Sequence, residues 1–307
     1  MFDITGKRFL FFIISGVFIL AAVISLGVFG LKSGIEFNSG SLLTVRFEQE
    51  VNQVDLKAEL VSLGYSNVII QRTGTGDFLI RLSTLSGDEK AAVESALTTR
   101  FGNLTETGFD SVSSMVAKKT AQNAVIAVAV AAVGILLYVS WAFRRMPQPF
   151  RYGACAIIAL VHDTLVALGV FSILGALLDW QIDVMFITGI LAVIGYSVND
   201  TVVIFDRIRE NLIRGVSPSF EVTVNNSLVE TLGRSLNTSL TTLFTVLALL
   251  LFVGATIQNF AVVLLIGITA GTFSSICIAP TLLVVWEKGE WGRFVRWFPL
   301  LPKSKAR

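Results

Sequence analysis

The sequence predicts a membrane bundle of six α-helices that carries one inserted α+β domain. Three observations lead to this fold class. The chain of 307 residues is 53% hydrophobic and only 15% charged, with a mean hydropathy of +0.73. Six apolar segments are each long enough to cross a hydrocarbon layer, which needs about 20 such residues. One stretch, residues 31–122, instead has the composition of a soluble domain.

This composition excludes several classes of protein. A chain as apolar as this one is not a soluble enzyme. Its net charge of +2 is too small to indicate a nucleic acid as its partner. Cys155 and Cys277 both lie in apolar runs, where free cysteine behaves as a small hydrophobic residue. We therefore expect no disulfide framework, no metal site and no cofactor, and we expect both thiols to be buried and inert.

The first span, residues 9–30, has no charged residue and follows Lys7 and Arg8. A cleaved signal peptide would share that basic flank. The apolar run is too long for one, however, and Ser25-Leu26-Gly27 is followed by more apolar sequence instead of a clear cleavage site. We interpret this segment as a membrane helix, with residues 1–30 forming the N-terminus and first span.

Residues 31–122 alternate between strand and helix patterns. Strands are predicted at 41–47, 67–72, 77–82 and, weakly, 104–112, with helices at 53–63 and 87–101. The order β-α-β-β-α-β is that of the ferredoxin-like arrangement. The segment contains no His, no Cys and no nucleotide-binding loop, so we expect binding or mechanical work from it.

The remaining spans are predicted at 123–143, 153–178, 182–205, 235–258 and 260–286, followed by a basic tail at 287–307. Lys and Arg in the short flanking segments all fall on one face of a six-span topology, whereas the loops 179–181 and 257–259 have none. Short basic flanks stay in the cytoplasm. Both termini are therefore predicted to be cytoplasmic, with residues 31–122 outside.

The third span contains His162 and Asp163. A helical rise of 1.5 Å per residue places Asp163 about 15 Å into the membrane, near its midplane. Charged residues at that depth face the bundle interior and mark proton or ion paths. The alternative is a structural hydrogen bond to a neighbouring helix. His162 should project about 100° away from Asp163 around the helix, and both a relay role and simple packing remain open for it.

The fourth span ends in a polar stretch that runs from Gly195 to Asn211. Asp200, accompanied by Ser197, Asn199 and Thr201, suggests a hydrated path into the bundle. Arg207 is seven residues further on and shares its face. Two pairs, Asp206 with Arg209 and Arg207 with Glu210, have the three-residue spacing of surface ion pairs. Ordinary anchoring at the cytoplasmic boundary would explain this basic cluster equally well.

Two weaker patterns complete the reading. Gly267 and Gly271 in the sixth span and the alanine-rich second span would let helices pack closely. Apolar residues at every fourth position in 220–232 predict a helix on the cytoplasmic face, which could also be a partner surface.

Three stretches resemble the SecF proteins of the SecD/SecF family, which belong to the RND superfamily. Residues 34–40 (GIEFNSG) are similar to the family's GIDFTGG loop, with Gly34, Phe37 and Gly40 matching and Glu36, Asn38 and Ser39 departing. Residues 195–211 match the fourth-span signature closely, and residues 234–242 resemble the entry to the fifth span.

The resemblance implies half of an RND-type bundle that works with SecD beside the SecYEG channel in the bacterial inner membrane. It also implies YajC and YidC as further partners and a translocating polypeptide as cargo. The implied activity is use of the proton motive force in late, ATP-independent steps of export. Asp163, Asp200 and Arg207 fall at the implied proton-linked positions. His162, Asn199, Asp206 and Arg209 are supporting candidates.

Two other functions are weighed against this one. A stand-alone RND-like exporter of small molecules or lipids would need a large apolar cavity in the outer domain. An intramembrane hydrolase would use His162 and Asp163, but no Ser in a nucleophile motif pairs convincingly with the one His of the chain. We therefore predict a non-enzymatic subunit.

Overall fold

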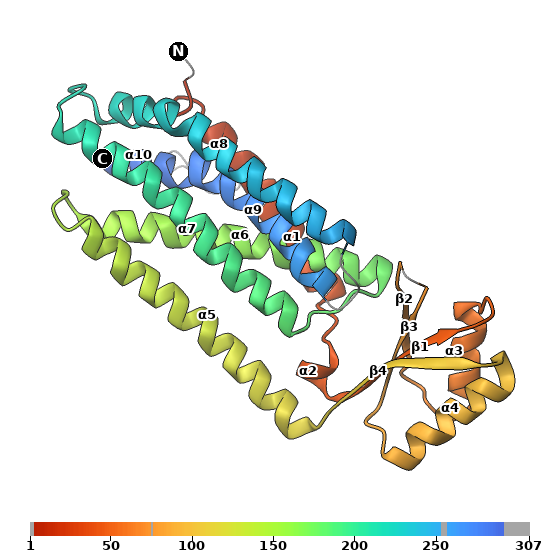
Figure 1. Cartoon of the computed structure of the whole chain (residues 1–307). Coiled ribbons are helices and arrows are strands. Elements are labelled where there is room, and N and C mark those ends of the chain that lie inside the picture. Colours follow the sequence, from red (N-terminus) through yellow and green to blue (C-terminus); the bar gives the residue numbers. More distant parts are fainter. Residues whose placement is uncertain (1–2, 75, 253–256, 292–307) are drawn as a thin grey trace, which may run out of the picture.

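The computed structural model describes residues 3–74, 76–252 and 257–291, and within them six helical segments are long and apolar enough to cross a membrane. These are α1 (Arg8–Phe29), α5 (Ser114–Ala142), α6 (Pro149–Leu178), α7 (Val184–Ile213), α8 (Phe220–Phe252) and the segment Gln258–Lys288. Figure 1 shows them packed lengthwise, with the α+β domain at one end of the bundle. The predicted fold class is confirmed.

The last segment is not a uniform helix. It consists of α9 (Gln258–Phe273), one π-helical turn η2 (Ser274–Ile278) and α10 (Ala279–Lys288). Pro280, at the start of α10, has no backbone N–H and its ring clashes with the carbonyl one turn earlier. An interruption of the regular ladder is expected at such a position.

Several helices extend beyond the predicted spans. The helix α5 begins at Ser114 and α7 continues to Ile213, since helices can project past the hydrocarbon layer into water. The helix predicted at 220–232 is present, but it is the first part of a continuous α8 and not a separate element. Val224 and Leu228 are fully buried there and do not face lipid. The end of the predicted fifth span at 253–256 and the tail at 292–307 lie outside the described residues.

The centre of the bundle is formed by α6, α7 and the segment α9–α10, while α1, α5 and α8 are more exposed. Small residues allow the closest approaches. A Cβ on Gly169 of α6 would lie 2.3 Å from Cβ of Ala22 on α1, and one on Gly267 of α9 would lie 2.2 Å from Val193 on α7. The prediction of close packing holds for Gly267. On α5, the alanine-rich second span, Gly134 has open space around it.

The outer domain is a four-stranded antiparallel sheet in the order β2-β3-β1-β4. Its elements are β1 (Gly40–Phe47), α3 (Gln53–Ser62), β2 (Ile69–Arg72), β3 (Phe78–Leu82), α4 (Gly87–Phe101) and β4 (Leu104–Val112). Alternate residues of β1 and β3 point to α3 and α4 and form a separate core. Leu43, Leu56, Ile80 and Leu97 are fully buried in it. This is the predicted ferredoxin-like arrangement.

Candidate functional site

Asp163 lies in the middle of α6, and its carboxyl group contacts three helical elements. Its exposed fraction is 1%. Oδ2 accepts hydrogen bonds from the Ser197 hydroxyl on α7 at 2.6 Å and from the Ser274 hydroxyl on η2 at 2.8 Å. Oδ1 lies 3.0 Å from Nδ1 of His162. A carboxyl group at this depth needs such partners, because burial of an unpaired polar group is costly.

The approach of α9 and η2 to α7 creates this environment. A Cβ on Gly271 would lie 3.0 Å from Cβ of Ser197 and 3.4 Å from Oδ2 of Asp163. The π-helical turn that follows holds one more residue per turn than an α-helix, and such turns are frequent at functional sites. Both Ser274 and Ser275 are fully buried there.

Asp200 lies on α7 and has fewer hydrogen-bond partners than Asp163. Its exposed fraction is 8%. Both of its carboxyl oxygens lie 2.7 Å from the hydroxyl of Ser235 on α8. Asp200 thus depends on a single side chain of the described residues, in contrast to Asp163.

A second set of hydroxyls joins α7 to η2. Ser275 Oγ lies 2.8 Å from Thr201 Oγ1 and donates to the backbone carbonyl of Ser197 at 3.1 Å. Within the described residues, no hydrogen bond joins the partners of Asp163 to those of Asp200. A proton passing from one carboxyl group to the other therefore needs water or a side-chain movement.

His162 contacts its sequence neighbour Asp163, contrary to the expectation that the two side chains point apart. The angle between successive Cβ directions is large, but the imidazole is long enough to bring Nδ1 to 3.0 Å from Oδ1 of Asp163. The other ring nitrogen, Nε2, is buried and has no hydrogen-bond partner in the described part of the chain. The ring packs against Phe273, with centroids 6.2 Å apart.

Arg207 lies apart from both carboxyl groups, although it shares a helix face with Asp200. Nη1 pairs with Glu210 at 2.5 Å and Nε with Glu230 on α8 at 2.5 Å. Asn211 donates to the same Glu230 at 2.9 Å. This arrangement ties the end of α7 to α8 and leaves no direct contact from Arg207 to Asp200.

The remaining supporting candidates are on the surface. Asp206 and Arg209 form the predicted pair at 2.6 Å, with both side chains substantially exposed, where such pairs contribute only a few tenths of a kcal/mol. Asn199 is exposed. The expectation that it is buried with Asp200 is therefore wrong, because it faces about 100° away around the helix.

Asn199 belongs to a larger exposed set that is unusual for membrane helices. On α7 the exposed residues include Thr188, Ala192, Gly195 and Asn199, and on α8 they include Arg234, Asn237, Thr238 and Thr241. Apart from the adjacent Asn237 and Thr238, the members of each series are three or four residues apart, so each series follows one side of its helix. We call these two series the polar stripes. Small and polar residues on membrane helices are typical of helix interfaces.

The loop with the predicted signature joins the outer domain to the bundle. The Gly34 N–H donates to the carbonyl of Ile182 at 2.7 Å, and the Ile182 N–H donates to the carbonyl of Lys32 at 2.8 Å. A Cβ on Gly34 would lie 3.0 Å from the carbonyl oxygen of Ile182. Gly40 has a φ of +134°, and a Cβ on it would lie 2.6 Å from the carbonyl oxygen of Leu82. Glycine is therefore required at Gly40, whereas a side chain at Gly34 would push against the Ile182 carbonyl.

Side chains strengthen this joint. Arg81 of β3 donates to the Ser33 carbonyl and, at 2.8 Å, to the Gln181 side chain in the loop between α6 and α7. The half-buried Glu36 lies in α2 (Ile35–Asn38), and burial raises the pKa of its carboxyl group. Phe37 is also only half-buried. The loop thus holds the outer domain against the bundle.

Comparison with known proteins identifies the family. The sequence signature of "Protein export membrane protein SecD/SecF, C-terminal" matches residues 92–289. A protein translocase subunit SecF from Thermobaculum terrenum is 44% identical over 308 residues, which cover 96% of this chain and 97% of that protein. The chain belongs to the SecD/SecF family.

Other members of the SecD/SecF family show a wider organisation. The protein translocase subunit SecDF from Bacillus subtilis is 34% identical over 94% of this chain, but the match spans only 38% of that longer protein. The crystal structure of SecDF, a translocon-associated membrane protein from Thermus thermophilus, matches with a TM-score of 0.84 and 31% identity. That match covers 94% of this chain and 39% of the SecDF chain.

Of the hydroxyls that bond to the carboxyl groups, Ser197 and Ser235 lie inside the stretches that resemble the family, but the sequence did not single out Ser235 or Ser274 as a partner of a carboxyl group. Both are buried, and only their position in or beside apolar spans could have indicated a role. Among residues 3–74, 76–252 and 257–291, no three His, Cys, Asp or Glu side chains are grouped in a way that could hold a metal ion. The chemistry that this site supports is proton exchange at carboxyl groups.

Proposed function

We propose that this SecF-type chain is a subunit of the bacterial Sec protein translocase that couples proton entry to protein export. The observation that carries the proposal is a pair of buried carboxyl groups, Asp163 and Asp200, at the helix contacts of a chain that aligns along almost its whole length with SecF proteins. Intramembrane carboxyl groups of this kind mark proton relays in transporters.

The relay uses the difference between charged and neutral carboxyl groups. Asp163 bonds to Ser197 and Ser274 from two other elements, so a change in its charge alters the contact between α6, α7 and η2. Asp200 does the same for the contact between α7 and α8 through Ser235. Arg207 supports the second contact indirectly, because its pair with Glu230 joins the same two helices.

SecD is the partner that completes the bundle. The fused SecDF of Bacillus subtilis supports this assignment, since this chain spans only part of its length. The polar stripes of α7 and α8 supply the surface, because exposed Asn199, Arg234 and Asn237 would be costly against lipid but can pair with polar groups of another helix. Asn199 thus contributes to docking SecD and not to a path inside this chain.

The chain is a multi-pass membrane protein, and we place it in the inner membrane with both termini in the cytoplasm. Arg8 at the start of α1 pairs with Glu221 on α8 at 2.5 Å and with Glu290 after α10 at 2.7 Å. These contacts lie at the end of the bundle opposite the outer domain (Figure 1). Arg144 and Arg145 lie in the turn between α5 and α6, and Arg151 lies in the first turn of α6; this turn is at that same end of the bundle (Figure 1). Such a basic end is typical of the cytoplasmic side.

The outer domain performs the mechanical part of export. Its joint at Gly34, Arg81 and Ile182 connects it to the loop between α6 and α7, and these two helices carry Asp163 and Asp200. Helix movement can therefore reach the domain directly. SecYEG would deliver the emerging polypeptide to it, with YajC and YidC as further partners and late, ATP-independent translocation as the step that is promoted.

The alternative of a stand-alone exporter is not favoured. Its expected mark was an apolar cavity in the outer domain. The hollow of about 750 Å³ at the base of this domain is lined largely by polar residues, among them Lys32, Ser39, Lys57, Asn67 and Arg81. Relatives that match the whole chain are named translocase subunits.

We also assign no enzymatic activity to the chain. A hydrolase would need a nucleophile within reach of the imidazole. Here the Ser197 and Ser274 hydroxyls bond to Asp163, and His162 reaches only that same carboxyl group through Nδ1. The arrangement is suited to positioning a carboxyl group and not to activating a serine.

Purification of the tagged chain in mild detergent tests the proposal. We expect SecD and SecYEG subunits to be recovered with it. Asn237→Trp, on a polar stripe, should reduce SecD recovery, whereas Leu236→Trp, at an exposed position on another side of the same helix, should not. Recovery of a homo-oligomer without SecD would support the exporter instead.

A further inference from the structure

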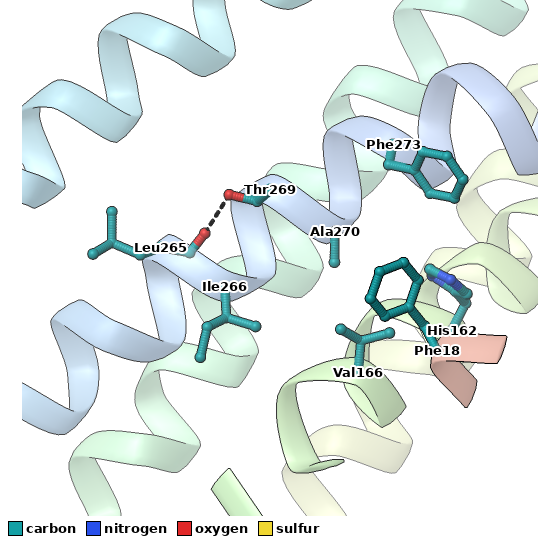
Figure 2. Close-up of a pocket in the computed structure, with 8 residues that line it drawn as sticks. All are labelled: Phe18, His162, Val166, Leu265, Ile266, Thr269, Ala270 and Phe273. Atoms are coloured by element: carbon teal, nitrogen blue, oxygen red, sulfur yellow. Dashed lines mark hydrogen bonds between the residues drawn. The ribbon is translucent and has the colours of Figure 1, made fainter. Parts of the chain in front are cut away.

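A pocket of about 430 Å³ opens between α1, α6 and α9, and His162 is one of the residues that line it. Figure 2 shows the residues that line it. They are Phe18 from α1, His162 and Val166 from α6, and Leu265, Ile266, Thr269, Ala270 and Phe273 from α9. The walls are therefore almost entirely apolar, and the volume is in the range of small-molecule sites.

Two polar side chains line the pocket, and one of them is already satisfied. The Thr269 hydroxyl donates to the Leu265 carbonyl at 2.7 Å (Figure 2). The imidazole of His162 is different. Its exposed fraction is 4%, Nδ1 is paired with Asp163, and Nε2 has no hydrogen-bond partner in the described residues. A buried polar atom without a partner calls for an explanation such as a missing ligand.

We propose that this pocket binds a lipophilic molecule with a single hydroxyl group, such as an alkylphenol or a long-chain alcohol, whose hydroxyl pairs with Nε2 of His162. The apolar walls hold the hydrocarbon part. They offer no countercharge to a charged head group, which excludes charged amphiphiles. This binding is separate from the export role and does not depend on it.

The chemistry of the His162–Asp163 pair selects a hydroxyl over other polar groups. When Asp163 is ionised, Nδ1 carries the ring proton and Nε2 is an acceptor that needs a donor. When Asp163 is protonated, it can donate to Nδ1, and Nε2–H then needs an acceptor. A hydroxyl group can donate and accept, so it satisfies Nε2 in both states. An ether or ketone satisfies only one, and a hydrocarbon satisfies neither.

The chain contains one His, so ¹⁵N-labelled histidine reports on this site alone. The full-length chain would be placed in lipid nanodiscs and titrated with 4-hexylphenol, with 4-hexylanisole, which lacks the donor, and with hexylbenzene. With Asp163 ionised, we expect a saturable shift of the Nε2 resonance with the phenol and none with the other two. Equal shifts for all three compounds, or no shift with the phenol, would overturn the proposal.

Two variants test the location. Ala270→Phe fills the pocket from α9 and Phe18→Trp fills it from α1, and each should abolish the phenol-induced shift. Val130→Phe, at an exposed apolar position on α5, is the matched control and should retain it. Because the two variants fill the pocket from different helices, loss of the shift in both is not explained by misfolding of one of them. A phenol shift that persists in both would show that the molecule binds elsewhere.

Discussion

Asp163 and Asp200 are both buried carboxyl groups on central helices, yet their surroundings differ. Asp163 has hydrogen-bonding contacts from three side chains and almost no exposure, while Asp200 has one hydroxyl partner and lies next in sequence to the exposed Asn199. The difference suggests a division of labour. Asp163 fixes the packing of three elements, and Asp200 is freer to change its partner when SecD or water approaches.

The largest expected effect is loss of coupling at either position. Asp163→Asn and Asp200→Asn keep side-chain size and some hydrogen bonds but cannot exchange a proton. Both should reduce proton-dependent export in inner-membrane vesicles to background, with normal protein level and normal SecD association. Unchanged export in either variant would remove that residue from the relay.

Lengthening the side chain sharpens this comparison. Asp163→Glu should be inactive, because Oδ2 is held between the hydroxyls of Ser197 and Ser274 and a longer side chain would move it away from both. Asp200→Glu should keep part of the export activity, since only Ser235 constrains its carboxyl group. The same vesicle assay measures the export activity of both variants. Equal activity would contradict the proposed difference in role between Asp163 and Asp200.

Stability should separate the two positions as well. Asp163→Leu leaves the Ser197 hydroxyl and Nδ1 of His162 without a partner, whereas the Ser274 hydroxyl keeps its bond to the Gly271 carbonyl, and each buried group without a partner costs about 1–3 kcal/mol. We expect a loss of about 3 kcal/mol or more in unfolding free energy. Asp200→Leu strands one hydroxyl and should lose about 1–2 kcal/mol. Unfolding in detergent measures both losses, and a larger loss for Asp200→Leu would overturn the ranking.

The glycines near Asp163 give a further contrast. Gly267→Ala places a Cβ 2.2 Å from Val193 and should destabilise the chain by about 1–3 kcal/mol through overpacking. Gly195→Ala meets open space and should stabilise α7 by up to about 1 kcal/mol, because alanine has the better helix propensity. Thermal unfolding of the two variants compares them, and similar midpoints would contradict the close contact of α7 and α9.

A smaller effect is expected outside the membrane at Glu36. Burial raises the pKa of this carboxyl group in the folded chain, so the neutral form favours folding. Stability should be highest below the unfolded-state pKa, about 4.3, and should fall as pH rises through the higher folded-state value. Glu36→Gln should remove this part of the pH dependence. A persisting dependence would assign it to another group.

The smallest effect is expected for Arg207→Lys. Lysine keeps the positive charge but cannot bridge Glu210 and Glu230 with two separate nitrogens. The partly exposed pairs are worth about 0–1 kcal/mol, and Arg207 does not contact Asp163 or Asp200. Export should therefore be retained almost fully. Loss of export with correct topology would place Arg207 in the proton-linked network directly.

Much of the fold followed from the sequence because its signals are local. Apolar runs identified the spans, and alternation identified β1 and β3. Helix ends such as Ser114 and Ile213 were missed because hydropathy records the lipid boundary and not the end of the hydrogen-bonded helix. The break at η2 also has no hydropathy signal.

The site was only partly predictable. The cost of intramembrane charge singled out Asp163 and Asp200. The sequence could not predict which serines bond to these carboxyl groups. A hydroxyl in a helix commonly bonds to the backbone carbonyl one turn earlier instead, as Thr241 does with Asn237. Only the rotation of the neighbouring helix decides which serine faces a carboxyl group.

The extra residue in η2 has a mechanical consequence. If this turn tightened to ordinary α-helical winding, the segment beyond it would rotate by about 100° relative to α9. Ser274, which bonds to Asp163, lies inside the turn. A change in the charge of this one carboxyl group would then twist α10 and move Glu287 away from its contact with Arg151, which carries a signal from the centre of the bundle to its end opposite the outer domain.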